Sequence, residues 1–303
     1  MSPLVTIGLP VHNGEKHVGA TIESILTQTV DDLVLVVSDN ASTDATGVVC
    51  KEFAAHDDRV RYVRRSTDIG GRANFHATLD LAPPSPYFKW AGHDDLLEPT
   101  FLERCLGYLD ATPGAVLCQT LIRAIDGDDR PLPSPGPPIA FDDPTPHERL
   151  RSLFAQPKTH QTLWGVMRRD VLERTGKFGS WYTADRGLLT ELSLYGGFGR
   201  VDEVLFVHRE HEGRGDYMDD ENRIEWYLPE RNGKAATEYW PHLRALVRIL
   251  ATTPMPPAER ALCAAEFARR AGAKLHEWPP HLTAEAVAVA RAWNRRRTTP
   301  PPD

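Results

Sequence analysis

The sequence predicts an α/β protein built on a mostly parallel sheet with helices on both faces. Apolar, β-branched runs alternate with segments of helical spacing over roughly the first 95 residues. The run Leu33–Val37 is apolar throughout, which is typical of a parallel strand covered on both faces. Polar residues follow three of the runs, at the strand ends where ligands bind in open α/β sheets.

The first half reads as strands separated by helices. The predicted strands are 4–9, 33–37, 60–63, a buried central strand that begins at Tyr87, and 115–119. The predicted helices are 15–29, a segment that Ser42 or Thr43 can cap and that runs to about 55, one from a glycine turn at 70–71 to about 81, and 100–112.

The second half is less regular. Residues 126–146 are rich in Pro, Asp and Gly and predict a long surface loop, mobile or lid-like. Next come a helix at 147–155, a strand at 161–167, helices from 169 and 185, and a strand or hairpin arm at 198–207. Helices are predicted at 235–251, 257–273 and 283–297. We therefore expect a catalytic domain over 1–230 and a helical extension over 231–303.

Composition excludes several classes of protein. The 303 residues are 41% hydrophobic and 25% charged, as in a globular protein, and the net charge of -7 gives no electrostatic case for nucleic acid. No apolar stretch is long enough to predict a transmembrane helix or a signal peptide. The four cysteines form no CxxC pair, which favours free thiols in a reducing, cytoplasmic compartment. The basic cluster Arg295–Arg297 reads as a favourable charge at a helix C-terminus, or as weak contact with an anionic membrane.

Two adjacent carboxylates, Asp94 and Asp95, follow the central strand. Adjacent carboxylates repel each other unless a proton or cation intervenes. Mg²⁺ or Mn²⁺ is commonly held by one or two carboxylates together with substrate phosphates. The alternative is a solvated turn that caps the next helix. The polar clusters His12/Asn13 and Asp39/Asn40 at two other strand ends favour a binding site.

The first half resembles the family 2 glycosyltransferases of the GT-A fold. The matching motifs are Val5–Glu15, Val36–Asp44, the set Gly70, Ala73 and Asn74, and the set His93, Asp94, Asp95 and Pro99. The resemblance is specific over residues 4–119, weaker over 160–212, and absent after about 230. This sequence departs from the family pattern at Gly92, where the family usually has the first carboxylate of its metal motif.

The resemblance implies a nucleotide-sugar site. Pro10, Val11 and His12 would line the nucleoside pocket with Glu15 close by, and Asp39 would hydrogen-bond the base or, alternatively, cap the next turn. Arg64 and Arg72 would touch base, ribose or phosphate, or else be solvated, and His93 would orient sugar or phosphate. The donor would be a UDP-, GDP- or dTDP-linked sugar.

The resemblance also implies a catalytic base at Asp185, where a helix starts beyond the sheet, although the usual preceding Glu is Ala184. The alternative for Asp185 is a helix N-cap. Glu191 is a weaker candidate. His211 would approach the metal or the diphosphate, with His208 as the near alternative.

Three functions are compatible with these residues. The leading hypothesis is an inverting, metal-assisted glycosyltransferase acting on an unknown acceptor. A nucleotide-sugar mutase of the same fold would keep the nucleotide and metal sites but need no acceptor. A non-catalytic nucleotide-sugar binding protein is the third, and the presence of Asp94, Asp95 and Asp185 argues against it.

Overall fold

The structure, a computed structural model, describes residues 2–156, 160–179, 184–212, 226–227 and 239–273. It divides into two compact units, Met1–Pro254 and Met255–Asp303. In the second unit the described part is one helix, α10 (Pro257–Ala273). The sheet and the candidate site belong to the first unit. The predicted domain boundary at 230/231 and the predicted helix at 283–297 lie outside the described residues.

The first half alternates strand and helix as the sequence predicts. Its elements are β1 (Val5–Val11), α1 (Val18–Leu26), β2 (Leu33–Asp39), α2 (Thr46–His56), β3 (Val60–Arg64), α3 (Gly71–Asp80), β4 (Tyr87–Trp90), β5 (Leu96–Leu97) and α4 (Phe101–Ala111). The second half of the first unit contains β6 (Ala115–Asp126), β7 (Pro131–Leu132), α5 (Pro146–Ala155), the 3₁₀ helix η1 (His160–Trp164), β8 (Val166–Arg168), α6 (Arg169–Arg174), α7 (Ala184–Tyr195), β9 (Gly197–Glu210) and α9 (Tyr239–Thr252).

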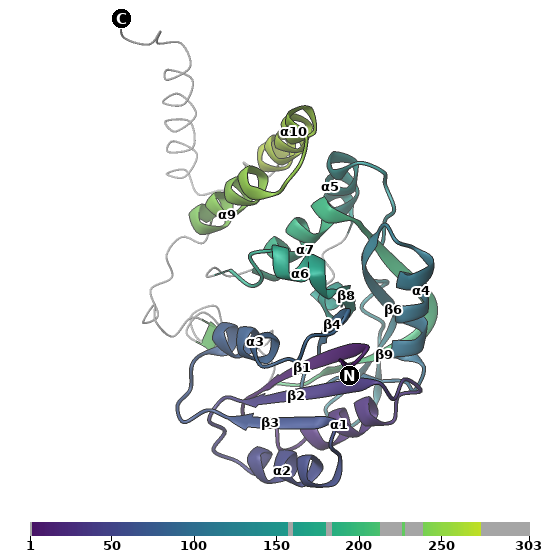
Figure 1. Ribbon diagram of the computed structural model, residues 1–303, viewed down its shortest axis with the longest axis vertical. Coiled ribbons are helices and arrows are strands. Elements are labelled where there is room, and N and C mark those ends of the chain that lie inside the picture. Colours follow the sequence, from purple (N-terminus) through teal and green to yellow (C-terminus); the bar gives the residue numbers. More distant parts are fainter. Residues whose placement is uncertain (1, 157–159, 180–183, 213–225, 228–238, 274–303) are drawn as a thin grey trace, which may run out of the picture. The chain divides into compact units, whose positions relative to one another are not determined.

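One mixed sheet runs through the unit in the order β3-β2-β1-β4-β8-β6-β9-β5, with β7 paired to β6. Strands β3, β2, β1 and β4 are parallel, β8 is antiparallel to both of its neighbours, and β6 and β9 are parallel to each other. Figure 1 shows β1, β2 and β3 side by side, with α1 and α2 along one face and α3 on the other. The predicted fold class, a mostly parallel sheet flanked by helices, is confirmed.

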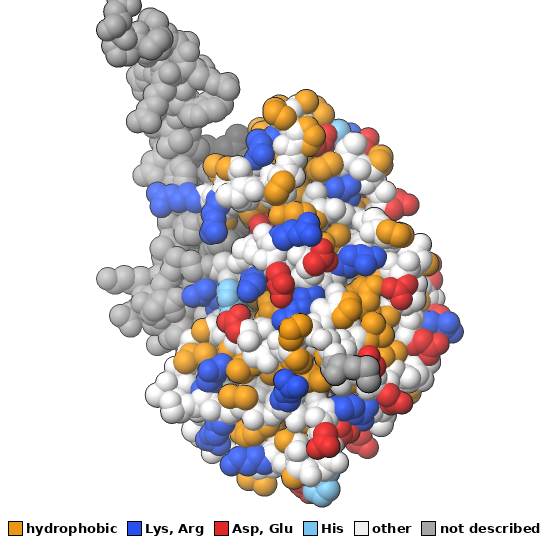
Figure 2. All heavy atoms as spheres, in the orientation of Figure 1, with side chains coloured by type: hydrophobic (Ala, Val, Ile, Leu, Met, Phe, Trp, Pro, Cys, Tyr) orange, Lys and Arg blue, Asp and Glu red, His pale blue; other side chains and the backbone are white. Residues whose placement is uncertain are grey.

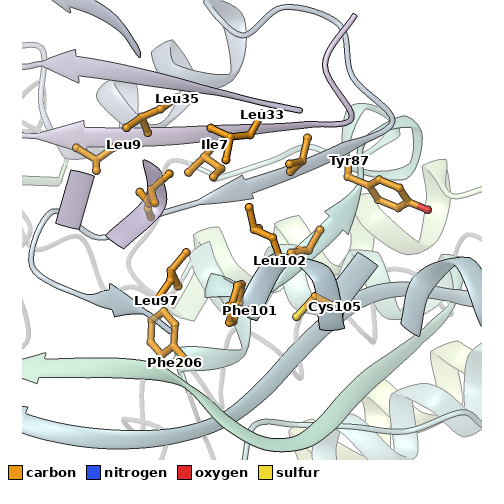
Figure 3. Packing of buried hydrophobic residues seen from close by; sticks show 14 of the residues in the cluster. Ile7, Leu9, Leu33, Leu35, Tyr87, Leu97, Phe101, Leu102, Cys105 and Phe206 are labelled. Atoms are coloured by element: carbon orange, nitrogen blue, oxygen red, sulfur yellow. The ribbon is translucent and has the colours of Figure 1, made fainter. Parts of the chain in front are cut away.

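Side chains alternate between two apolar clusters, one on each face of the sheet. On β4, Tyr87 and Ala91 just beyond its end belong to the first cluster, whereas Phe88 and Trp90 belong to the second. The first cluster includes the buried faces of α1 and α4, and Figure 3 shows α4 residues such as Phe101 packed beneath the strands. The second cluster includes residues of α3, α6 and α7. This two-sided packing explains why the central strands are apolar throughout.

One local prediction is wrong, and a second is correct only in part. Residues 161–167, predicted as one strand, form most of η1 and only then enter the short strand β8. Segment 126–146 is not simply a lid-like surface loop. Its first part is the β6–β7 hairpin, Ile139 is buried, and Phe141 forms a β-bridge with Phe198. The apolar residues among the prolines hold the segment against the sheet.

The surface carries mixed charge. On the face shown in Figure 2, Lys and Arg side chains are interspersed with Asp and Glu. None of the described helices is both long and apolar enough to cross a membrane.

Candidate active site

The ends of β1, β2 and β4 meet at one edge of the sheet. The N–H of Asn40, just after β2, donates to the Val11 carbonyl at 2.8 Å, and the N–H of Ala91, just after β4, donates to the Gly8 carbonyl at 2.9 Å. Nδ1 of His12 donates to the Asn40 carbonyl at 2.8 Å. The three polar clusters therefore lie together, as the sequence predicts.

Asp94 and Asp95 are both buried, with 4% of each residue exposed. Nε2 of His211, just beyond β9, donates to Oδ2 of Asp94 at 3.0 Å. Nδ1 of His208 donates to Oδ1 of Asp95 at 3.1 Å. Both histidines named from the sequence thus reach the carboxylates, one each, because β9 pairs with β5 immediately after Asp95.

Arg209 holds the same turn from within β9. Its backbone N–H donates to Oδ1 of Asp95 at 3.0 Å, and its Nε donates to the Asp94 carbonyl at 3.0 Å. Its guanidinium also contacts Oδ1 of Asp129 at 2.5 Å. The sequence analysis did not single out Arg209. The available signal was a charged residue between two histidines at the end of an apolar strand.

Gly92 lies next to the two carboxylate oxygens that the histidines do not contact, Oδ1 of Asp94 and Oδ2 of Asp95. A β-carbon on Gly92 would lie 2.9 Å from Oδ1 of Asp94 and 2.9 Å from Oδ2 of Asp95. These are not the oxygens that the two histidines contact. Two carboxylate oxygens therefore converge over a residue without a side chain, which is a donor set that suits a hard divalent cation.

The described residues contain no group of three or more His, Cys, Asp or Glu side chains already arranged as a metal site. A cation held here by Asp94 and Asp95 would therefore take its other ligands from substrate or water, as Mg²⁺ does in sites that bind phosphates. With substrate or water as the further ligands, Asp94 and Asp95 fit the Mg²⁺ or Mn²⁺ ion that the sequence implies.

His17, which the sequence analysis missed, lies beside His211 with the ring centres 5.0 Å apart. It is buried, and Nε2 finds no hydrogen-bond partner among the described residues. The pKa of His17 is lowered to about 4, chiefly by burial and also by Arg209 and His211, although Asp94 acts in the opposite direction. His17 is therefore neutral at pH 7 and adds no positive charge beside Asp94.

Asp39 is completely buried at the end of β2. Its Oδ1 accepts the N–H of Ser42 at 2.8 Å, and its Oδ2 accepts the hydroxyl of Tyr62 at 2.6 Å. Arg64 lies 3.9 Å from Oδ2 and donates to the Ser42 carbonyl at 2.5 Å. The capping role that the sequence left open is therefore present, and Tyr62, unnamed from the sequence, anchors the carboxylate.

The other residues expected in the nucleoside pocket surround the same edge. Pro10 and Val11 are the buried last residues of β1, and His12 is half-buried after them. Glu15 is exposed, and its carboxylate accepts the N–H of Ala45 at 2.7 Å, where α2 begins. The ring of His93 packs directly on Gly14: a β-carbon there would lie 2.5 Å from Cδ2 of His93.

Asp185 is the second residue of α7 and is half-buried. Its neighbour Tyr227 donates to the Gly179 carbonyl at 3.4 Å. Burial raises the pKa of Tyr227 well above its usual range, the carboxylate of Asp185 raises it further, and Arg72 lowers it. Arg72 and Asp185, from α3 and α7, thus act on the same phenol, while Trp226 packs on Gly71 at the start of α3.

Glu191 has a different environment from Asp185. It is buried on α7, and its Oε2 accepts the N–H of Gly176 at 2.8 Å. Burial raises the pKa of Glu191, whereas the Gly176 hydrogen bond and Arg248 lower it. This carboxylate fixes the loop after α6, which makes Glu191 the weaker candidate for a base.

A mixed sheet of this strand order, with buried carboxylates and histidines at its strand ends, agrees with the GT-A fold that the sequence motifs imply. The sequence profile of "Glycosyl transferase family 2" matches residues 6–176, and the chain belongs to this family. The resemblance inferred from the motifs is confirmed.

Curated relatives match about a third of the chain. The chondroitin synthase of Escherichia coli is 35% identical over 105 residues, which is 34% of this chain and 15% of that protein. The putative glycosyltransferase EpsE of Bacillus subtilis is 32% identical over 109 residues, 36% of this chain and 39% of that protein. The matched region is thus well under half of either relative.

Solved structures share the fold over most of the chain. S. aureus TarS 1-349 in complex with UDP has a TM-score of 0.61 at 14% identity and covers 88% of this chain and 72% of its own. The mannosyltransferase PcManGT of Pyrobaculum calidifontis, in complex with GDP-Man and Mn²⁺, has a TM-score of 0.54 at 20% identity and covers 97% and 81%. At these identities the likeness establishes the fold.

Proposed function

We propose that this protein is an inverting glycosyltransferase that moves a sugar from a nucleoside diphosphate sugar to an acceptor hydroxyl. The observation that carries the proposal is the convergence of Asp94 and Asp95 at the edge where β1, β2 and β4 end. Buried carboxylates there, braced by two histidines, suit the binding of a diphosphate through a divalent cation.

Asp94 and Asp95 would hold Mg²⁺ or Mn²⁺, with His211 at the same site. Bound there, the ion would supply positive charge that stabilises the departing nucleoside diphosphate. His208 and Arg209 hold Asp95 from β9, as residues around a metal site commonly orient its ligands. A side chain at position 92 would displace both carboxylates, so Gly92 allows them to keep this arrangement.

The nucleoside would bind along Pro10, Val11 and His12. Asp39 stays our prediction for the residue that selects the base, together with Tyr62, which orients it. Arg64 and Arg72 would lie toward base or phosphate. UDP-, GDP- and dTDP-linked sugars are all candidate donors, and the two fold neighbours bound to UDP and to GDP-Man support a donor of this chemistry.

Asp185 would take the proton from the acceptor hydroxyl. The first turn of α7 points backbone N–H groups toward a carboxylate there and favours its charged form. Asp185 is half-buried near Tyr227, so its carboxylate would remain accessible to an acceptor. His93, packed on Gly14 between the first and fourth strand ends, would orient sugar or phosphate.

A panel of UDP-, GDP- and dTDP-sugars incubated with the protein and Mn²⁺, without acceptor, tests the proposal. A transferase releases nucleoside diphosphate slowly by transfer to water. An isomerised nucleotide sugar would instead establish a mutase, and tight binding without turnover would establish a binding protein. The cytoplasmic location predicted from the cysteines, all four of them buried free thiols, stays a prediction.

A further inference from the structure

Lys89 lies in the middle of β4 with no solvent exposure. Strand alternation puts it on the face of the first apolar cluster, between Tyr87 and Ala91. Its ammonium lies 5.0 Å from the ring centre of Phe101 and 5.3 Å from that of Phe206, two rings that Figure 3 shows near each other. Among the described residues no carboxylate forms an ion pair with Lys89. An apolar residue would fill this place without the cost of burying a charge.

The ammonium instead donates hydrogen bonds to main-chain carbonyls. Nζ donates to the carbonyl of Trp90 at 3.0 Å and to the carbonyl of Trp164. The pKa of Lys89 is lowered to about 7, chiefly by burial, although Cys105 and Asp95 act in the opposite direction. Protonated or neutral, the amine keeps at least two N–H groups, enough for both carbonyls.

These two carbonyls lie where the pairing of β4 with β8 ends. Strand β4 pairs with β8 at Tyr87–Arg168 and Phe88–Met167, and the pairing stops there. Beyond this point the chain before β8 is the 3₁₀ helix η1, which ends at Trp164 and offers no further strand hydrogen bonds. The Lys89 side chain therefore takes the place of the missing ladder between β4 and the chain that ends at Trp164.

Trp90 is the last residue of β4, and the turn that carries Asp94 and Asp95 begins directly after it. On the other side, Trp164 packs against Phe75 of α3, with ring centres 6.1 Å apart. Lys89 thus connects the start of the carboxylate turn to the 3₁₀ helix that precedes β8.

We propose that Lys89 is a positioning residue that sets the turn of Asp94 and Asp95 by holding the carbonyls of Trp90 and Trp164. It acts through the backbone and touches neither ion nor substrate. The inference rests on the proposed function, because that function assigns the two carboxylates to the ion.

Two substitutions separate its role from packing. Lys89→Met keeps length and apolar stem but removes every donor, whereas Lys89→Gln keeps an amide with two N–H groups and no charge. Cys105→Ala is the matched control, since Cys105 is a buried neighbour of Lys89 on α4 whose thiol interacts with Cys118. The probe is Mn²⁺ titrated together with the nucleoside diphosphate (UDP, GDP or dTDP) that the wild type binds, and amide hydrogen exchange is measured over 91–97 and 160–168.

We expect Lys89→Met to fold with a melting temperature close to that of the wild type, because removing a buried charge offsets the loss of two carbonyl contacts. It should bind Mn²⁺ with nucleotide about tenfold more weakly and exchange faster in both segments. Lys89→Gln should recover most of the affinity and protection, and Cys105→Ala should keep both.

Wild-type affinity and exchange in a folded Lys89→Met protein would overturn the assignment, as would equal losses in Cys105→Ala. If Lys89→Met is unfolded, Lys89→Gln decides: losses as large as expected for Met would show that carbonyl bonding is not the function of Lys89. A wild-type protein that binds no Mn²⁺ with any of the nucleotides would instead overturn the proposed function. The amide exchange rates would still show whether Lys89 holds the two segments.

Discussion

Nε2 of His211 lies 3.0 Å from Oδ2 of Asp94, joining residues 117 positions apart in the chain. The contact fixes one oxygen of the carboxylate and leaves Oδ1 directed over Gly92, where Oδ2 of Asp95 also lies. The same strand holds Asp95 through His208 and Arg209. Strand β9 thus orients a pair of carboxylates that the central strand supplies.

Replacing Gly92 by alanine should weaken binding of the divalent ion. The new β-carbon would lie 2.9 Å from an oxygen of each carboxylate, closer than real contacts allow, so Asp94 and Asp95 must move. We expect a loss of about tenfold in Mn²⁺ affinity, or about 1.4 kcal/mol, measured by titration with nucleotide present. Gly107→Ala is the control, because a β-carbon there meets nothing within 4 Å. Equal affinities in both variants would contradict this role for Gly92.

Replacing Tyr62 by phenylalanine should destabilise the base pocket. The change removes the 2.6 Å hydrogen bond to Oδ2 of the fully buried Asp39. A buried acceptor left without its donor costs about 1–3 kcal/mol, which chemical denaturation can measure. We also expect weaker nucleotide binding by calorimetry. Unchanged stability together with unchanged nucleotide affinity would show that Tyr62 does not anchor Asp39.

Lys89 should make stability depend on pH in the alkaline range. Its pKa is lowered from 10.5 to about 7 in the folded protein, chiefly by burial. Between these pH values the unfolded chain binds the proton that the folded chain has lost, so the free energy of unfolding rises with pH. Relative to Lys89→Met, the wild type should gain stability from pH 7 toward pH 10. Parallel curves for the two proteins would show that the ammonium keeps its ordinary pKa.

The sequence predicts the first half well because strand and helix periodicities there agree with the motifs. Leu33–Val37 is predicted as a covered strand and is one, and His12, Asp39 and Asp94 lie at or just beyond the ends of neighbouring strands. Arg209, Tyr62 and His17 escaped because their roles depend on tertiary contacts, such as β9 pairing with β5, that no local pattern encodes.

The strand predicted at 161–167 failed for a related reason. Its apolar run satisfies strand periodicity, yet β8 begins only at Val166, and Trp164 is instead held by the Lys89 side chain. The sequence shows that Lys89 lies in an apolar strand, but it does not indicate which carbonyls the side chain contacts. Glu191 could be ranked below Asp185 from the sequence, but its contact with Gly176 needed the structure.

Asp185→Asn should remove most turnover while nucleotide affinity stays near the wild-type value. Loss of a general base typically lowers the rate by about a hundred- to ten-thousand-fold. Asp185 is the second residue of α7, so asparagine removes only a favourable charge near the helix N-terminus and α7 should still form. Circular dichroism and calorimetry check folding and binding in the same sample. Wild-type turnover in this variant would limit Asp185 to stabilising the first turn of α7 and favour a mechanism without a protein base.

The central claim is that a divalent ion at Asp94 and Asp95 supports reaction of a nucleotide sugar. The most direct measurement is the rate of nucleoside diphosphate release from the reactive donor, before and after chelation and after Mn²⁺ is restored, in the wild type and in Asp94→Asn/Asp95→Asn. We predict that chelation abolishes release, that Mn²⁺ restores it in the wild type, and that the double variant stays inactive at every ion concentration while still folded. Full release after exhaustive chelation, or a fully active double variant, would contradict the account.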